Sequence, residues 1–515
     1  MAMTNTARIA NDSPFCESQQ DMKKLEDALS NDEAMRAPLH EIERMLETQG
    51  REMLRAMMQA HFDLRSEQER RVEVHSADGV EHAKVRRGSR KVETKFGEVE
   101  LDRNLYQAPE ADALAPLDAA MELADEKYSY EVRRIVAEAA ARVSFDEVVE
   151  LVQKQSGAQV PKRQAEELAV RAARDFDAFY RDRLREPEEN DHLLVLSFDA
   201  KGIATLHRDL REATRRKAEK TPRRLETRLV KGEKPNRKRM AEVATVYSIE
   251  KWPRTIGDVL HGVHDKREKA ERRPRPTNKR VWASIVHSPQ RVISDAFDEA
   301  FRRDPDQRRR WVVLVDGNKD QLARIKRAAR DIGVEITIVL DIVHVLEYLW
   351  SAAYAFHPEG STEAEQWVEC RMLALLNGRS GGEIAKSLRA MIKTHQLDAD
   401  TAEPVEDAVK YLVNNTRLLH YDRALADGLP IATGVIEGAC RYLVKDRMGR
   451  TGAVWSAAGA EAVLRLRALR TSGDFDDYWL FHLAKEHERT HKSRYANGDV
   501  PDPLPPSRPR LRLVK

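Results

Sequence analysis

Apolar residues recur at helical spacing through much of the first 190 residues. Residues 40–64 carry such a pattern, interrupted at Gly50, and predict one long or broken amphipathic helix that could pack within the chain or pair with a second copy. Residues 90–106 alternate apolar and polar side chains around Gly97, which predicts a small hairpin. Helical spacing returns at 131–182. The N-terminal part is therefore expected to be mostly helical with a small β element.

A pair of helices is indicated inside 131–182. Ser144 is a capping residue before a short apolar-periodic run that Gly157 ends, and Pro161 opens a second run. The second helix carries Lys162 and Arg163, so the pair is consistent with a helix-turn-helix whose second helix enters a major groove. The alternative is an ordinary helical hairpin that does not contact DNA.

The middle of the chain changes to short, continuous apolar runs, which are typical of buried strands. Helical patterns at 289–301 and 320–333 separate the later runs. Three strands in sequence, followed by alternating helix and strand, predict an α/β fold with a mixed sheet. The five runs are 193–198, 243–249, 280–286, 311–317 and 335–341.

Residues 342–429 contain no convincing strand pattern and predict helices only. A further helix is expected around Glu437 and another at 459–473. The predicted organisation is a disordered N-terminus (1–36), a helical and small β region with possible dimerisation (37–130), a helix-turn-helix-like region (131–189), a first core segment (190–341), a helical insertion (342–429), a second core segment (430–485) and a flexible basic tail (486–515).

Three acidic residues in separate segments suggest a site that binds divalent cations. Asp199 and Asp316 each close an apolar strand, and Glu437 lies on a predicted helix. Hard divalent cations take oxygen ligands, and two such ions can activate a nucleophile and stabilise the leaving oxygen of a phosphodiester. Gly434 and Gly438 are expected to let the Glu437 helix approach the sheet. The alternatives are turn residues for the aspartates and an i,i+4 ion pair with Arg441 for Glu437.

Asp341 and His344 form a D-x-x-H pair at the end of the fifth predicted strand. Their place near the other carboxylates suggests that they orient the scissile phosphate, accept a hydrogen bond or stabilise the site. A buried structural histidine is the alternative interpretation.

Basic residues near Glu437 suggest contacts with DNA. Each could add a salt-sensitive contact to a phosphate, and an aromatic residue among them could stack on an unpaired base or pack in the core. A second basic stretch, 201–240, holds fifteen Lys and Arg against five Asp and Glu, and could be a polyanion-binding face or a solvated loop. The candidates are Arg441, Lys445, Arg447, Arg450, Trp455, Arg237, Lys238 and Arg239.

Composition sets the class of protein. The chain has 515 residues and a net charge of only +2. Its three cysteines, Cys16, Cys370 and Cys440, are not spaced as a zinc site or disulfide framework, which favours a reducing cytoplasm. The N-terminal segment lacks the apolar core of a signal peptide, and no apolar run approaches the length of a membrane span. A cytoplasmic, nucleoid-associated protein is expected.

With these residues in place, the chain resembles bacterial insertion-sequence transposases of the DDE type, specifically the ISKra group. The similarity covers roughly 190–480 and is most specific at 428–479. The resemblance implies a ribonuclease-H-like fold interrupted by an all-helical insertion, with Asp199, Asp316 and Glu437 as catalytic triad and metal ligands. Many relatives carry metal-binding cysteines near the N-terminus, whereas this chain has only Cys16 there, so no zinc domain is expected.

The resemblance also implies a mechanism and partners. Two Mg²⁺ or Mn²⁺ ions, bridged by Asp199, would activate water at a transposon end, and the freed 3′-hydroxyl would attack target DNA. The implied partners are double-stranded DNA, as terminal inverted repeats and target, and further copies of the chain in a homodimer or higher oligomer. The alternatives are a ribonuclease-H-like nuclease or resolvase without strand transfer, and a domesticated transposase that only binds DNA or serves an RNA-guided system.

Overall fold

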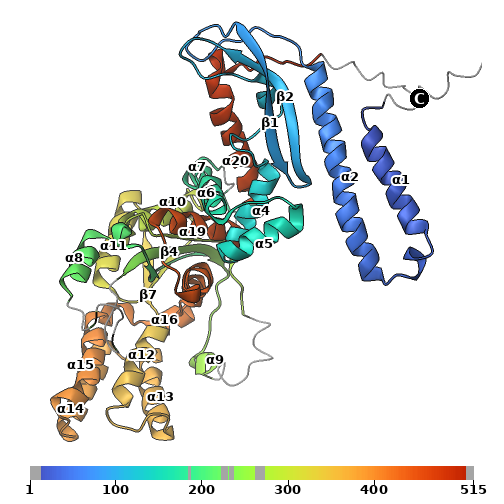
Figure 1. The fold of residues 1–515 in the computed structure, drawn as a ribbon. Helices are drawn as coiled ribbons and strands as arrows, with labels where there is room; N and C mark the ends of the chain where they lie inside the picture. Colours follow the sequence, from blue (N-terminus) through green and yellow to red (C-terminus); the bar gives the residue numbers. More distant parts are fainter. Residues whose placement is uncertain are drawn as a thin grey trace, which may run out of the picture. The chain divides into compact units, whose positions relative to one another are not determined.

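The computed structural model describes residues 13–183, 187–188, 190–221, 225, 230, 237–260 and 273–505. The chain divides into two compact units (Figure 1). Unit 1 combines Met1–Arg181 with Phe475–Lys515, and unit 2 is Asp182–Asp474. The predicted regions 37–130 and 131–189 therefore belong to one unit up to Arg181, and the C-terminal part of the chain joins them.

Unit 1 begins with a helical hairpin. Helix α1 (Cys16–Ser30) and the short η2 (Ala34–Arg36) precede α2 (Leu39–Gln68), which runs unbroken through Gly50. The prediction of disorder for 1–36 is wrong from Cys16 onward, because α1 packs along α2 and buries Leu25. Residues 1–12 lie outside the described part of the chain.

The predicted hairpin is confirmed and is longer than expected. Strands β1 (Lys84–Thr94) and β2 (Gly97–Gln107) pair antiparallel around a tight turn, where Gly97 has φ of +125°. Phe62 of α2 packs with Val92, Val99 and Leu101 of the hairpin. This packing covers the C-terminal half of α2 only.

Five short helices follow, and the predicted helix pair is among them. Ser144 forms a capping box with Glu147, and Gly157 ends the helix in the left-handed conformation with φ of +72°. Pro161 precedes the second helix. The helices are α3 (Pro116–Ala120), α4 (Tyr130–Ala140), α5 (Phe145–Ser156), α6 (Lys162–Ala172) and α7 (Phe176–Asp182).

The C-terminal segment completes unit 1, so two predicted boundaries are wrong. Helix α20 (Phe475–Thr490) belongs to unit 1 rather than to a second core segment ending at 485. Beyond it, η8 (Lys492–Arg494) and η9 (Ala496–Gly498) flank Tyr495, which is 3% exposed and packs against Val74 and Tyr106. This burial anchors 486–498, so the predicted flexible tail does not start at 486; 506–515 lie outside the described residues.

Unit 2 contains the predicted mixed sheet, with strand order β5-β4-β3-β6-β7. β3, β4 and β5 pair antiparallel, and β6 and β7 continue parallel to β3. All five predicted strands are confirmed. Their bounds are β3 (Leu193–Ala204), β4 (Lys238–Ile249), β5 (Thr277–Ser284), β6 (Trp311–Val315) and β7 (Ile336–Leu340).

Helices α10 (Pro289–Arg303) and α11 (Lys319–Ile332) connect the later strands, as predicted. α10 packs on β3 and β4, and Gly333 ends α11 with φ of +76°. Shorter elements surround the sheet: η3 (His207–Asp209), α8 (Glu212–Lys220) and α9 (Ile256–Leu260). Within the predicted basic stretch 201–240, residues 222–224, 226–229 and 231–236 lie outside the described residues.

Residues 342–429 are helical throughout, as predicted. The helices group together beyond β7, away from the rest of the sheet in Figure 1. They are α12 (Ile342–Ala353), α13 (Thr362–Leu376), α14 (Gly381–Thr394), α15 (Ala399–Asn414), η5 (Thr416–Leu418) and α16 (Tyr421–Ala426).

The chain then returns to the sheet. α17 (Gly434–Ala439) continues into a π-helical turn, η6 (Cys440–Lys445), and into α18 (Asp446–Met448), and both α17 and η6 pack against β3. After η7 (Arg450–Gly452), α19 (Ala457–Ser472) packs on β5. Within the described residues, every helix is too short or too polar to cross a membrane.

Candidate active site

Three aspartates share one row across the adjacent parallel strands β3, β6 and β7. Ser197 pairs with Leu314, and Val315 pairs with Leu340. Continuing this register places Asp199 beside Asp316 and Asp316 beside Asp341. Neighbouring strands lie about 4.8 Å apart, and ligands of open α/β sheets bind outside the carboxyl ends of the strands. The sheet topology therefore gathers carboxylates that are 142 positions apart in the chain.

Asp199 does not end its strand, contrary to the sequence prediction. β3 continues to Ala204 and stays paired with β4, where Asp199 lies opposite Val243. β6, by contrast, stops at Val315. The end of the shorter neighbouring strand therefore leaves one side of β3 open from Asp199 onward.

Asp341 is completely buried and fully hydrogen bonded. Its Oδ1 accepts from the backbone N–H groups of Val343 and Thr433 at 3.1 and 3.2 Å. Its Oδ2 accepts from His344 Nδ1 at 2.8 Å and from the Thr433 hydroxyl. Burial would raise the pKa of Asp341, but these hydrogen bonds outweigh it and hold the pKa below its ordinary value. Asp341 thus caps α12 and orients His344.

His344 lies close to Glu437. Potential ligand atoms of Asp341, His344 and Glu437 lie within 4.8 Å of one another. The hydrogen bond to Asp341 raises the pKa of His344 to about 9, so the imidazole is a cation at neutral pH. Burial and the charge of Asp341 raise the pKa of Glu437. The group is a compact acid–base cluster with one fixed cation.

The His344 pair predicts a pH-dependent stability. The folded-state pKa of about 9 lies above the ordinary value of 6.5, so the stabilisation is complete below pH 6.5 and is lost as pH rises through 9. We expect the difference in unfolding free energy between wild type and His344→Ala to shrink between pH 6.5 and 9.5 in urea titrations with chelator present. A constant difference across that range would contradict the assigned pair.

Glu437 is exposed and reaches the cluster from α17. Its Oε1 lies 3.5 Å from the Thr433 hydroxyl, and no ion pair with Arg441 occurs among the described residues. The glycine explanation is wrong: a Cβ on Gly434 would meet nothing within 4 Å, and one on Gly438 only Tyr442 of the next turn. Neither glycine is needed for close approach to the sheet.

Cys440, three residues after Glu437, connects this helix to β3. Its thiol donates to Asp199 Oδ2 at 3.0 Å, while Asp199 Oδ1 accepts from the N–H of Ala200 at 2.6 Å. Burial, followed by the charge of Asp199, raises the pKa of the Cys440 thiol, so it stays protonated and can donate. Cys440 also begins the π-helical turn, a feature often found at functional sites.

The helical region supports Asp316. Tyr411 of α15 donates its hydroxyl to the Asp316 carbonyl at 2.8 Å and stacks on Tyr348 of α12 at 4.1 Å between ring centroids. Asp316 Oδ1 accepts from the N–H of Asn318. Gly317, at φ of +92°, allows the turn to pack against Asn415, which is 2.8 Å from where a Cβ would stand. The helices of 342–429 therefore support the turn that follows β6.

The predicted triad is brought to one region, but not into a single tight cluster. Among the described residues, no group of three possible ligands within 4.8 Å contains two of Asp199, Asp316 and Glu437. Glu437 groups instead with Asp341 and His344. Sequence reasoning missed Thr433 and Cys440; the one available signal was their spacing of four residues before and three after Glu437.

Several predicted DNA contacts are accessible. Arg441, Lys445 and Arg450 are exposed around η6, and Arg237 and Lys238 are exposed at the start of β4. In unit 1, Lys162 and Arg163 are exposed on α6, where they pair with Asp146 at 2.8 Å and Glu167 at 3.2 Å. These residues remain candidates for phosphate contacts.

Three other predicted contact residues have partners inside the chain. Trp455 is 7% exposed; its backbone pairs with Ala204 and Leu206 at the end of β3, and its indole donates to the Met448 carbonyl at 3.1 Å. Arg447 is buried with its guanidinium over the Trp455 ring. Arg239 donates to two backbone carbonyls, those of Ile285 and Asp209. Core packing therefore uses Trp455 and Arg447, whereas the half-buried Arg239 is held by backbone carbonyls.

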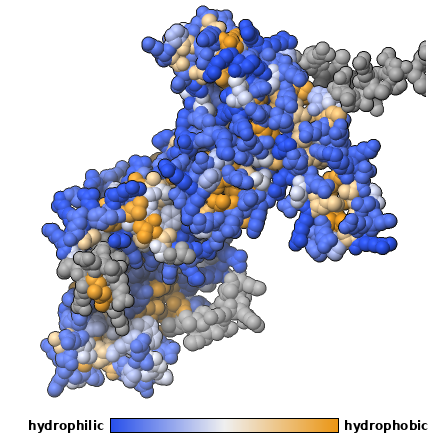
Figure 2. Space-filling model, viewed as in Figure 1, coloured by the Kyte–Doolittle hydropathy of each residue, from blue (hydrophilic) through white to orange (hydrophobic). Residues whose placement is uncertain are grey.

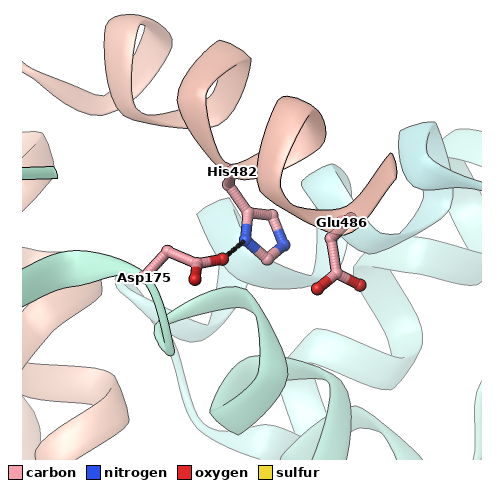
Figure 3. Close-up of side chains that lie close together, drawn as sticks. All are labelled: Asp175, His482 and Glu486. Atoms are coloured by element: carbon pink, nitrogen blue, oxygen red, sulfur yellow. Dashed lines mark hydrogen bonds and ion pairs between the residues drawn. The ribbon is translucent and has the colours of Figure 1, made fainter. Parts of the chain in front are cut away.

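Unit 1 contains a second acidic cluster, which the sequence did not suggest. Figure 3 shows His482 of α20 between Asp175 and Glu486, with its Nδ1 2.7 Å from Asp175 Oδ2. Arg489 pairs with both carboxylates, and Arg133 lies 3.4 Å from Glu486 Oε2. Because arginines already neutralise these carboxylates, the cluster fits a buried ion network that fixes α20 better than a metal site.

A comparison of the chain with models of known protein families finds no match. A comparison with curated proteins also finds none.

Proposed function

We propose that this protein is a DDE-type transposase that cuts phosphodiesters at the ends of an insertion sequence and joins the freed 3′-hydroxyl to target DNA. The observation that carries the proposal is the shared row of Asp199, Asp316 and Asp341, with α17 bringing Glu437 beside it. Acidic residues at adjacent strand ends are an arrangement suited to divalent ions and a polyanionic substrate.

The sheet order supports this proposal. Numbered by appearance, the five strands lie in the order 3-2-1-4-5, with the first three antiparallel and the last two parallel to the first. That is the order expected of a ribonuclease-H-like sheet. In this interpretation, 342–429 is the helical insertion that precedes the last acidic residue.

The residues present fit Mg²⁺ or Mn²⁺. Asp199 and Asp316 are half-buried and Glu437 is exposed, so all three offer hard oxygen ligands at the surface of the site. Among the described residues, Asp316 Oδ2 has no hydrogen bond, and each engaged oxygen of Asp199 retains a second lone pair. Two bound ions would lower the pKa of the attacking water or 3′-hydroxyl and stabilise the leaving oxygen.

The chain's own side chains have separate tasks in this proposal. Cys440 keeps Asp199 oriented toward α17, and Tyr411 fixes the backbone at Asp316. The His344 cation, held through Nδ1 by Asp341, presents its other nitrogen as a donor for a non-bridging phosphate oxygen. Asp341 acts through His344, which makes it a positioning residue.

The test is a strand-transfer assay. Full-length protein is incubated with Mg²⁺, a target plasmid and labelled DNA taken from either side of the gene. The proposal predicts 3′-ends at the element boundary and their covalent joining to the plasmid. Cleavage without joining would favour the nuclease alternative, and binding without metal-dependent cleavage would contradict an active enzyme.

Lys201 gives a further prediction. It is exposed and lies two residues beyond Asp199 on β3, so both side chains are on the same face of the strand. Lys201→Ala is expected to weaken DNA binding and to reduce the slope of log affinity against log salt by about 1. Lys393→Ala, at an exposed position on α14, is the matched control. An unchanged slope for Lys201→Ala would exclude the phosphate contact.

A further inference from the structure

The N-terminal half of α2 has an apolar stripe that the chain itself leaves uncovered. Residues 39–55 contain no buried side chain, although Ala56, Ala60 and Phe62 farther along are buried. At 3.6 residues per turn, the stripe falls within roughly a quarter of the helix circumference. Its members are Leu39, Leu46, Gly50, Leu54 and Met57, and the four side chains are 73%, 39%, 40% and 43% exposed.

Exposed apolar side chains are concentrated on this hairpin. Six of the sixteen large apolar residues exposed in the described part of the chain lie between Met22 and Met57. Figure 2 shows orange side chains among the blue ones over the α1–α2 region. A contiguous patch of this kind marks an interaction site more often than single exposed residues do.

Gly50 gives a second, independent observation. It lies in the middle of the stripe and in the middle of a 30-residue helix, where glycine is less favourable than any ordinary residue. A Cβ at this position would meet nothing within 4 Å. Packing within the chain therefore gives no reason for a glycine, whereas close approach of another helix would.

We infer that the α1–α2 hairpin pairs with the same hairpin of a second copy of this chain, with Gly50 at the crossing of the two α2 helices. Two helical hairpins packed face to face form a four-helix bundle, and one surface serves both partners in a two-fold dimer. This inference uses no residue of the candidate active site and does not depend on the proposed function.

Size fits a second copy of the hairpin, and charge argues against DNA as the partner. The 30-residue α2 is about 45 Å long, the 15-residue α1 is about 22 Å long, and each helix is about 10 Å wide, so the face offers about 700 Å². A standard interface buries about 800 Å² per partner. The hairpin from Cys16 to Gln68 holds twelve acidic and seven basic side chains, a balance of −5, which repels a polyanion.

The test is the mass of the full chain in solution by light scattering, from 1 to 50 µM. The chain mass of 58.9 kDa predicts a dimer of about 118 kDa. Gly50→Trp and Leu46→Glu should each raise the dimer dissociation constant by about 30-fold or more. The matched controls are Gly382→Trp, another helical glycine, where a Cβ would meet only Ser380 Oγ at 3.9 Å, and Val80→Glu, another exposed apolar residue.

The outcomes are distinct. Loss of dimer in both stripe variants, with native circular dichroism and with dimeric controls, supports the inference. A monomeric wild type at 50 µM would overturn it. A dimer that persists in both stripe variants would also overturn it, because the interface would then lie elsewhere.

Discussion

Asp199→Asn is expected to reduce metal-dependent DNA cleavage by more than about 100-fold. Loss of a residue that only hydrogen bonds to a metal ligand costs a metal site up to about 100-fold in activity, and Asp199 is proposed to be a ligand itself. The amide keeps the shape of the side chain; its oxygen can accept from the Ala200 N–H and its NH2 group can donate to the Cys440 sulfur, so the local structure should persist. Only the ligand charge is removed. Single-turnover cleavage of end DNA measures the effect, and Asp199→Ala should behave alike.

DNA binding should change little in the same variant. Removing a negative charge next to a polyanion lowers repulsion, so we expect affinity within about threefold of wild type. Asp331→Asn, at an exposed position on α11, is the charge-matched control and should keep full cleavage. Retained cleavage in Asp199→Asn would remove Asp199 from the catalytic set.

Asp341→Ala is expected to lower the unfolding free energy of unit 2 by about 2–4 kcal/mol. The substitution removes the cap of α12, typically worth about 1 kcal/mol, and hydrogen bonds to a charged group, worth about 1.5–3 kcal/mol each. It also leaves the buried N–H of Thr433 unpaired. Relief of the buried charge offsets part of this loss.

Urea unfolding of the full chain, with Asp331→Ala as control, measures the stability effect. The same variant should return the pKa of His344 from about 9 toward its ordinary value, visible by NMR of the imidazole. A variant as stable as wild type, with the His344 pKa unchanged, would show that Asp341 does not orient the histidine.

Much of unit 2 could be predicted from the sequence because buried strands leave a direct signature. The run before Asp316 is apolar at every position and the run before Asp199 at every position except Ser197, which is typical of a strand covered on both faces. The strand could not be followed past Asp199, because Lys201 and Gly202 are polar or small. Pairing with β4, not composition, keeps the chain extended to Ala204.

Other features depend on contacts between distant segments. From the sequence, Trp455 could equally stack on an unpaired base or pack in the hydrophobic core. Only the pairing of its backbone with the end of β3 decides between these roles. The link from Cys440 to Asp199 spans 241 positions, and a lone cysteine gives no signal for it. No sequence pattern within helix α20 indicates that it packs with the N-terminal unit. Buried contacts such as the hydrogen bond between Asp175 and His482 place it there.

We propose that Asp199, Asp316 and Glu437 hold divalent ions at the sheet end. Fe²⁺ with ascorbate and peroxide tests it most directly, because iron in a carboxylate site generates radicals that cut the nearby backbone. We expect cuts near 199, 316 and 437 that Mg²⁺ suppresses and Asp199→Asn abolishes. Cuts confined to the region of Asp175 and His482, or an unchanged pattern in Asp199→Asn, would contradict it.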